Sequence, residues 1–366
     1  MSENGTTRQL PLHEMHEAAG ARFGPFAGYS MPLSYKAGVM QEHLHTREKA
    51  GLFDISHMQL LLVTGPDAAR LIGRVCPIDA AGQETGASKY TFALNDRAGI
   101  IDDLIVTRLG PERFMVVANA SRAAVDEAHI RAQAAGMDVA VEALVRAFLA
   151  LQGPQAAAVM ADAEIDIAGL TFMHGRESGS RFLTRSGYTG EDGFEIAVPL
   201  EEAECVAGKL SGDERVELIG LGARDSLRLE AGLCLYGNDL DETTDPASAG
   251  LLWAIPKPLR EGGDYVGAAA LAAIIAEGPK EKRVGLKAEG RQPVRGGALL
   301  SDADGAPAGR VTSGGFGPSA GHPVAMGYVR ADLAVPGTVV DADVRGKPVA
   351  MTVTKLPFVE KRSSKG

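Results

Sequence analysis

Two adjacent aspartates, Asp102 and Asp103, stand inside a run of isoleucine, leucine and valine at residues 99–106. Turn-forming residues precede the run, so it is predicted to be a buried strand that follows a turn. Side chains alternate along a strand, so the two carboxylates are expected on opposite faces, with Ile101 and Ile105 on the face of Asp103. A buried carboxylate is costly without a cation, several hydrogen-bond donors or a ligand. The alternative is that one aspartate caps the next turn and the other is solvated.

A second unusual stretch, residues 220–232, is rich in leucine and alanine and is predicted to form a helix that ends at Gly232. Arg224 and Arg228 then lie one turn apart, which is unfavourable unless anions neutralise them. Glu195 or the acid groups of a ligand could do so. The alternative is two solvated arginines on an exposed face, which the apolar surroundings make less favourable.

The glycine-rich residues 184–196 match neither the dinucleotide-binding fingerprint nor the P-loop. They are predicted to form a tight connection that presents Glu195 on a strand. Near the start of the chain, residues 32–51 are predicted to form a helix, with Pro32 close to its beginning and Gly51 at its end.

The sequence pattern changes near residue 279, where a short charged stretch is followed by many short predicted strands separated by Gly, Pro and Asp. This spacing is typical of a small β-barrel or sandwich. A chain of 366 residues is long enough for two or more domains. We therefore expect one α+β region at residues 1–278 and a β-barrel domain at residues 279–366.

Charge and composition exclude several classes of protein. With 47 acidic against 37 basic residues and a net charge of -10, a dominant nucleic-acid-binding surface is not expected. No apolar run approaches the roughly 20 residues of a membrane-spanning helix, and the polar first residues lack a targeting pattern. The three cysteines are far apart and are expected to be reduced core thiols rather than metal ligands. A cytoplasmic protein is expected, or a mitochondrial matrix protein if the source is eukaryotic.

Seven segments, taken in their order and spacing, carry a resemblance to a known family. The chain resembles the glycine cleavage system T-proteins, which are tetrahydrofolate-dependent aminomethyltransferases, from about His13 to Val359. The matching segments are GPFAGYSMPL (24–33), GLFDISHM (51–58), GIIDDLIV (99–106), GYTGEDGFE (187–195), GARDSLRLE (222–230), LYGNDLDE (235–242) and VTSGGFGP (311–318).

The resemblance implies an α+β fold of three lobes around a central folate cavity. Two interleaved α+β lobes come from the first three-quarters of the chain, and a C-terminal β-barrel forms the third lobe. It also implies an activity: transfer of the aminomethyl carbon from the lipoyl arm of H-protein to tetrahydrofolate. The products are 5,10-methylenetetrahydrofolate, ammonia and dihydrolipoyl H-protein. The expected partner is lipoylated H-protein, tetrahydrofolate is the co-substrate, and no metal is expected.

Family positions assign the catalytic role to Asp103. This carboxylate could stabilise an iminium-like carbon as ammonia leaves, orient the folate amine, or act as a general base, and the residue types do not separate these roles. Glu195 is expected to accept hydrogen bonds from the pterin, and Arg283 matches a position on the approach of the second substrate. The folate-binding positions are Met58, Leu62, Tyr90, Asp103, Ile105, Asn119, Glu195, Arg224 and Trp253.

Two other functions are compatible with such a pocket. One is a related tetrahydrofolate-dependent demethylase of a small sulfonium or methylamine substrate, which would keep the same pocket and aspartate. The match at residues 222–242 and near Arg283 favours the aminomethyltransferase. The other is a non-catalytic folate-binding protein of iron-sulfur assembly. That branch carries a reactive cysteine in a short Lys-Gly-Cys-Tyr-type motif, and none of Cys76, Cys205 and Cys234 lies in one.

Overall fold

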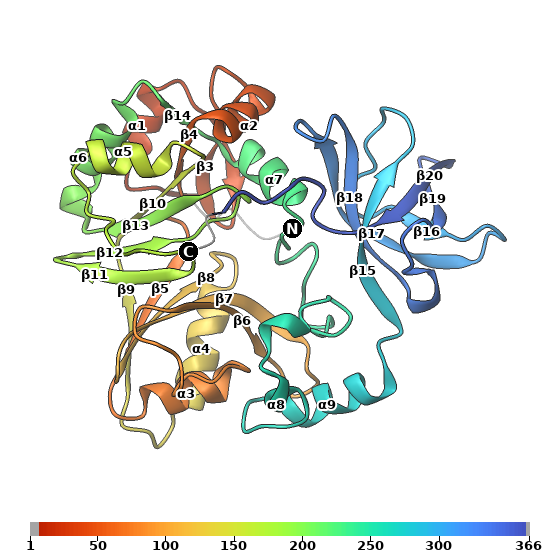
Figure 1. Ribbon diagram of the computed structural model, residues 1–366, viewed down its shortest axis with the longest axis horizontal. Coiled ribbons are helices and arrows are strands. Elements are labelled where there is room, and N and C mark those ends of the chain that lie inside the picture. Colours follow the sequence, from red (N-terminus) through yellow and green to blue (C-terminus); the bar gives the residue numbers. More distant parts are fainter. Residues whose placement is uncertain (1–6, 364–366) are drawn as a thin grey trace.

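The computed structural model describes residues 7–363, which form two stacked β-sheets covered by helices, and a separate β-barrel (Figure 1). The strands of the two sheets all precede residue 219, and the barrel comes from the end of the chain. The predicted α+β class and the C-terminal barrel are both confirmed.

The first large sheet has six strands, and helices α1 (His13–Ala18), α5 (Ala156–Asp162) and α6 (Leu200–Ser211) cover its outer face. In spatial order the strands are β11 (His174–Ser178), β12 (Arg181–Arg185), β13 (Gly193–Val198), β10 (Ala147–Gln152), β4 (Ala50–Asp54) and β14 (Val216–Leu218).

The second sheet has five strands and is covered on its outer face by α3 (Ala68–Val75) and α4 (Ala123–Gln133). Its spatial order is β6 (Ser88–Leu94), β7 (Ile100–Gly110), β8 (Arg113–Ala118), β5 (Gln59–Thr64) and β9 (Ala140–Leu144). The chain leaves the first sheet after β4, builds the whole second sheet, and returns to the first at β10. This order makes the two lobes interleaved.

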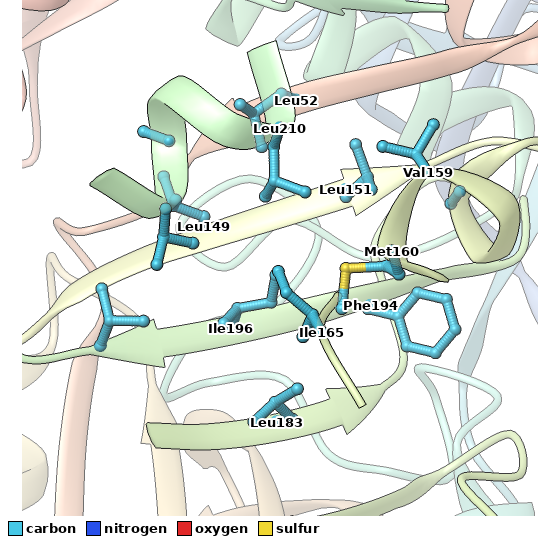
Figure 2. Close-up of a cluster of buried hydrophobic side chains, with 14 of the residues drawn as sticks. Leu52, Leu149, Leu151, Val159, Met160, Ile165, Leu183, Phe194, Ile196 and Leu210 are labelled. Atoms are coloured by element: carbon cyan, nitrogen blue, oxygen red, sulfur yellow. The ribbon is translucent and has the colours of Figure 1, made fainter. Parts of the chain in front are cut away.

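Alternation along the strands divides the core between the two lobes. In β10, Leu149 and Leu151 point outward into the cluster under α5 and α6, which Figure 2 shows, while Phe148 and Ala150 point inward. Side chains of β5 and β8 meet them from the second sheet, so a separate apolar cluster fills the space between the sheets. Each sheet is therefore buried on both faces. We expect truncation of a large inward side chain such as Phe148 to cost about 3–5 kcal/mol.

The barrel closes in the order β15-β18-β17-β16-β19-β20. It contacts the first lobe mainly through α7 (Leu221–Glu230), which packs on β17 and β18. After the barrel the chain returns to the first lobe, where the Phe358 amide donates to the Glu230 carbonyl (2.9 Å) and the Arg362 amide to the Gly190 carbonyl (2.8 Å). The barrel strands are β15 (Glu281–Ala288), β16 (Leu299–Ser301), β17 (Pro307–Gly317), β18 (His322–Arg330), β19 (Val339–Val344) and β20 (Lys347–Thr354).

The remaining described elements connect or flank these lobes. They are β1 (Arg8–Gln9), β2 (Arg22–Phe26) and β3 (Tyr29–Ser34), which form a small sheet, helix α2 (Val39–Glu48), the 3-10 turns η1 (Leu252–Ala254) and η2 (Ala331–Leu333), and helices α8 (Lys257–Arg260) and α9 (Ala268–Glu277).

The predicted helix at residues 32–51 is only partly correct. Pro32 lies inside strand β3, and α2 begins only after Gly38, whose φ of 82° interrupts any regular element. Gly51 is not a helix stop but lies in β4, where a Cβ would stand 2.5 Å from the Thr46 hydroxyl and 2.6 Å from Ile219. The glycine is required by close packing, which the local pattern does not reveal.

Strand β7 departs from simple alternation at Ile101. Ala93 pairs with Asp102 and Leu94 with Ile100, so Ile101 is an extra, bulged residue. Its side chain packs in the cluster under α3 and α4, together with Leu104. The expectation that Ile101 shares the face of Asp103 is therefore wrong. Ile105, beyond the bulge, does point into the cluster between the sheets.

Candidate functional site

Asp103 is held between two hydrogen-bond donors from the strands on either side of β7. The Tyr90 hydroxyl of β6 donates to Oδ2 (3.0 Å), and Asn119 Nδ2, just after β8, donates to Oδ1 (2.8 Å). Burial, followed by the negative charge of Asp102, raises the pKa of Asp103 to about 7. The carboxyl group is thus fixed in orientation and can change its protonation state near neutral pH.

Asp102 points to the opposite, outer face of the sheet and is fully buried. It accepts hydrogen bonds from the Asn119 backbone amide (2.9 Å) and from Asn119 Nδ2 (2.8 Å). A buried carboxylate was expected to need hydrogen-bond donors or a cation, and for Asp102 the donors are present. No cation contacts it within the described residues; the neighbouring group is the carboxyl of Asp126 on α4. Asn119 therefore bridges the two aspartates that alternation separates.

An aromatic pair stands beside Asp103. The rings of Tyr90 and Trp253 are stacked, with centroids 5.6 Å apart and planes inclined by 16°. Trp253, in η1, is 67% exposed, which is unusual for so large an apolar side chain. The pair offers an open aromatic face next to the carboxylate.

A second group of polar side chains gathers around Arg224 of α7. Its guanidinium lies over the Tyr188 ring, 4.7 Å from the centroid, and its Nη1 atom is buried without a hydrogen-bond partner among residues 7–363. Glu195 of β13 accepts a hydrogen bond from the Ser186 hydroxyl (2.9 Å). Burial raises the pKa of Glu195, whereas the charge of Arg224 lowers it. The strand placement predicted for Glu195 is observed.

Tyr188 connects the two polar groups. Its hydroxyl donates to the Cys234 carbonyl. Burial raises its pKa strongly, and the charges of Arg228, Asp103 and Arg224 all act on it. The charges of Asp103 and Arg224 therefore both act on one hydroxyl, that of Tyr188.

Apolar side chains from the cluster between the sheets complete this set. Met58 and Ile105 are only partly buried and pack against that cluster, and Leu62 is one of its buried members. The sequence-derived set therefore comes from β5, β6, β7, β13, α7 and η1, elements that lie far apart in the chain. Arg283 of β15 is tied to the backbone instead: its Nε donates to the Ala249 carbonyl (2.9 Å) and its Nη1 to the Gly232 carbonyl (3.4 Å).

The two arginines of α7 are neutralised in different ways. Arg228 is buried and pairs with Asp239 (2.8 Å) and Asp225 (2.7 Å), and its Nη2 donates to the Ser313 hydroxyl of β17 (2.9 Å), which links the helix to the barrel. Arg224 faces Tyr188 and Glu195 and keeps one free donor atom. The expectation that anions neutralise the two arginines is therefore met for Arg228, whereas Arg224 forms no ion pair within the described residues and only the charge of Glu195 acts on it.

Several residues of the site were missed by the sequence reasoning. Tyr188 lies within the segment GYTGEDGFE, and its aromatic ring in a glycine-rich connection was a usable signal. His57 is buried near Arg224, and burial together with the charge of Arg224 lowers its pKa to about 3, so it is neutral at pH 7. Outside the site, Asp126 is an acidic residue on the buried face of α4, and no local sequence signal marked it.

The raised pKa of Asp103 makes a testable contribution to stability. Its pKa in the folded protein, about 7, lies above the ordinary value of 3.8, so the folded state binds this proton more tightly. The resulting stabilisation is complete below about pH 3.8 and is lost as the pH rises through about 7. Asp103→Asn removes the titration. From pH 5 to pH 8, the unfolding free energy of the variant should therefore rise by on the order of 2 kcal/mol relative to that of the unmodified protein.

Denaturant unfolding at the two pH values measures this gain. Asp96→Asn, an exposed aspartate on the turn before β7, is the control and should show none. If the unfolding free energies of Asp103→Asn and the unmodified protein run parallel with pH, the pKa of Asp103 is not raised.

Comparison with known proteins places the chain in a family. The family described as the GCVT N-terminal domain matches residues 12–258, and the glycine cleavage T-protein C-terminal barrel domain matches residues 281–360. The crystal structure of glycine cleavage system aminomethyltransferase T from Bartonella henselae superposes with a TM-score of 0.96 at 56% identity. That match covers 98% of this chain and 100% of the other.

Curated relatives agree with this assignment. The mitochondrial aminomethyltransferase of Gallus gallus is 44% identical, with 96% of this chain and 92% of the relative covered. The aminomethyltransferase of Saccharopolyspora erythraea is 41% identical, with 97% and 99% covered. These names support the aminomethyltransferase expectation rather than the demethylase or the iron-sulfur assembly protein. The chain therefore belongs to the glycine cleavage T-protein family of aminomethyltransferases.

Proposed function

We propose that this protein transfers the aminomethyl carbon from the lipoyl arm of H-protein to tetrahydrofolate, releasing ammonia and dihydrolipoyl H-protein and forming 5,10-methylenetetrahydrofolate. Family membership over nearly the whole chain supports the reaction. The observation that carries the site is the carboxyl group of Asp103, fixed between Tyr90 and Asn119, with the exposed Trp253 stacked on Tyr90.

Asp103 is proposed as the catalytic residue. As ammonia leaves the transferred carbon, positive charge develops there, and a preorganised carboxylate stabilises that charge. The Tyr90 and Asn119 hydrogen bonds fix the carboxylate before the substrate arrives, so no reorientation is required during the reaction. A pKa of about 7 also allows the same group to take up a proton from the folate amine.

The other side chains are proposed to bind tetrahydrofolate. Glu195 accepts hydrogen bonds from the amide-and-amine edge of the pterin. The free Nη1 donor of Arg224 fits an acceptor atom of the same ligand. Tyr90 and Trp253 supply the aromatic surface, and the remaining proposed contacts come from Asn119, Met58, Leu62 and Ile105.

H-protein is the proposed partner, and Arg283 is proposed to lie on its approach. Arg283 is held by the backbone carbonyls of Ala249 and Gly232, which both precede the barrel, and its charge acts on Tyr90. We also propose that the chain divides into domains at residues 1–278 and 279–366.

A cytoplasmic location is proposed, or the mitochondrial matrix if the source is eukaryotic. No helix within residues 7–363 is long and apolar enough to cross a membrane.

The reaction is tested directly in a reconstituted assay. Purified protein, aminomethylated H-protein and tetrahydrofolate should yield methylenetetrahydrofolate and ammonia. Release of a methyl group from a free sulfonium or methylamine donor, without the lipoyl carrier, would instead assign the protein to the demethylases.

Glu195→Gln tests the proposed pterin contact. The change removes the charge but keeps the size, so tetrahydrofolate should bind about 10-fold more weakly while kcat at saturating folate changes little. Equilibrium titration and a KM measurement give the two values. Glu201→Gln, an exposed glutamate just beyond the same strand, is the matched control. Unchanged folate affinity in Glu195→Gln would remove Glu195 from the binding site.

A further inference from the structure

Asp126 is a fully buried carboxyl group for which the proposed reaction has no use. It lies on α4, is 1% exposed, and neither of its oxygens receives a hydrogen bond from a donor group among the described residues. The group it meets is the carboxyl of Asp102 on β7, which is 0% exposed. Two carboxyl groups in contact in such a place cannot both be ionised, so they share one proton.

The groups around Asp126 do not offer it a free cation. Arg122, at the start of α4, is engaged by the Ile101 carbonyl (2.9 Å) and by Glu242 (2.5 Å). Cys76, at the end of α3, is a buried thiol whose pKa burial raises to about 12, so it is neutral. Asp102 and Asp103 act from β7 with negative charge.

The other elements against α4 contribute uncharged groups. Thr91 of β6 has a buried hydroxyl without a hydrogen-bond partner in the described chain, and β9 contributes the apolar Val141. His129, one turn further along α4, has a pKa lowered by burial, and the charge that acts on it is that of Asp96. The carboxyl pair is therefore left with a single negative charge, and the cation that acts on Asp126, Arg122, is shared with Glu242.

We propose that Asp126 is a positioning residue that carries the proton of the Asp102–Asp126 pair, keeps Asp102 as the anion that fixes Asn119, and thereby sets the pH range in which Asp103 exchanges its proton. This proposal rests on the proposed role of Asp103. It concerns four neighbouring groups: Asp102 accepts twice from Asn119, Asn119 donates to Asp103, and the proton that we assign to Asp126 is donated to Asp102.

The direction of proton sharing follows from the surroundings. Burial raises the pKa of Asp102, but Asp102 already accepts two hydrogen bonds from Asn119, and these oppose the rise by favouring its ionised form. Asp126 has no such donors, so burial and the charge of Asp102 raise its pKa and the proton stays on Asp126. The Asp102 anion in turn is the second cause that raises the pKa of Asp103.

Two substitutions at Asp126 separate proton donation from packing. In Asp126→Asn the amide N–H can donate to Asp102 as the acid did, so the pH profile of kcat/KM should be unchanged. In Asp126→Leu the donor is lost and Asp102 takes up the proton itself. The part of the pH profile of kcat/KM that reports the titration of Asp103 should then move to lower pH, by roughly one unit.

Asp102→Asn provides the matched control, since it removes the same negative charge at its source. It should move the Asp103 titration in the kcat/KM profile to lower pH as well. The double variant with Asp126→Leu should show no shift of this titration beyond that of either single variant. A folded Asp126→Leu protein with the unmodified profile overturns the proposal, and so does a shift in Asp126→Asn as large as that in Asp126→Leu.

An infrared measurement does not depend on activity or on the leucine variant folding. At pH 8 the unmodified protein should show the C=O stretch of a buried protonated carboxylic acid, and Asp126→Asn should lack it. Absence of the band from the unmodified protein, or its persistence in Asp126→Asn, contradicts the proposal. If the proposed function were wrong, the transfer assay would show it: the unmodified protein would not transfer the carbon to folate, while the infrared band would still be present.

Discussion

Replacement of Asp103 by Asn is expected to lower the rate of methylenetetrahydrofolate formation by roughly 10²–10⁴-fold at saturating substrates. Asparagine has the same size and can still accept a hydrogen bond from Tyr90, but it carries no negative charge and cannot take up a proton. The loss should appear in kcat, because the missing charge acts on a cation that develops only during the reaction. Tetrahydrofolate affinity should change much less.

Single-turnover kinetics with aminomethylated H-protein, together with a folate titration, separate these effects. Asp96→Asn, exposed on the preceding turn, is the appropriate control. Asp102 is unsuitable for that purpose, because its carboxylate holds Asn119, which in turn holds Asp103. A near-normal rate in Asp103→Asn would exclude this carboxylate from the chemistry.

Replacement of Asp239 by Asn is expected to have the largest effect on stability, a loss of about 3–5 kcal/mol in the free energy of unfolding. Asp239 is buried between α7 and the barrel, where it accepts hydrogen bonds from Arg228 Nη1 (2.8 Å), the Leu235 amide (2.9 Å) and the Ser313 hydroxyl (2.8 Å). Without the carboxylate, the guanidinium of Arg228 stays buried with much of its charge uncompensated.

The same arginine provides a matched control. Asp225 also pairs with Arg228, at 2.7 Å, but its side chain is 55% exposed. Asp225→Asn should therefore cost less than about 1 kcal/mol. Urea unfolding of the two variants, followed by intrinsic fluorescence and by circular dichroism, measures the difference. Equal losses would mean that burial does not distinguish the two ion pairs.

Much of the fold was predictable because its signals are local. The helix at residues 220–232 followed from its leucines and from Gly232, and the structure has α7 at Leu221–Glu230 with Gly232 at a φ of 67°. The barrel followed from closely spaced turns and short strands. The helix expected at residues 32–51 was partly wrong, because strand β3 is stabilised by pairing with β2 and β1, which are distant contacts that a local pattern does not contain.

The candidate site was predictable only in part for the same reason. The cost of burying a carboxylate pointed to Asp103, and the family resemblance selected it over Asp102. The bulge at Ile101 could not be predicted, since it depends on how β6 pairs with β7. Glu242, whose backbone carbonyl would stand 1.8 Å from a Cβ at Gly99, shows how tightly a later segment packs on that turn. The position of Asp126 against Asp102 could be recognised only from the tertiary structure.

The amino-acid sequence by itself determined that two aspartates of one strand point in opposite directions, because alternation is a property of the extended backbone. It also determined, through the resemblance of seven segments, the family and the expected reaction. Only the tertiary structure decided what each aspartate faces. Asp103 faces the side of the second sheet that meets the first, and Asp102 faces α4 and the carboxyl of Asp126. The physical reason is that the energy of a buried charge depends on the groups around it, and those groups come from elements distant in the chain.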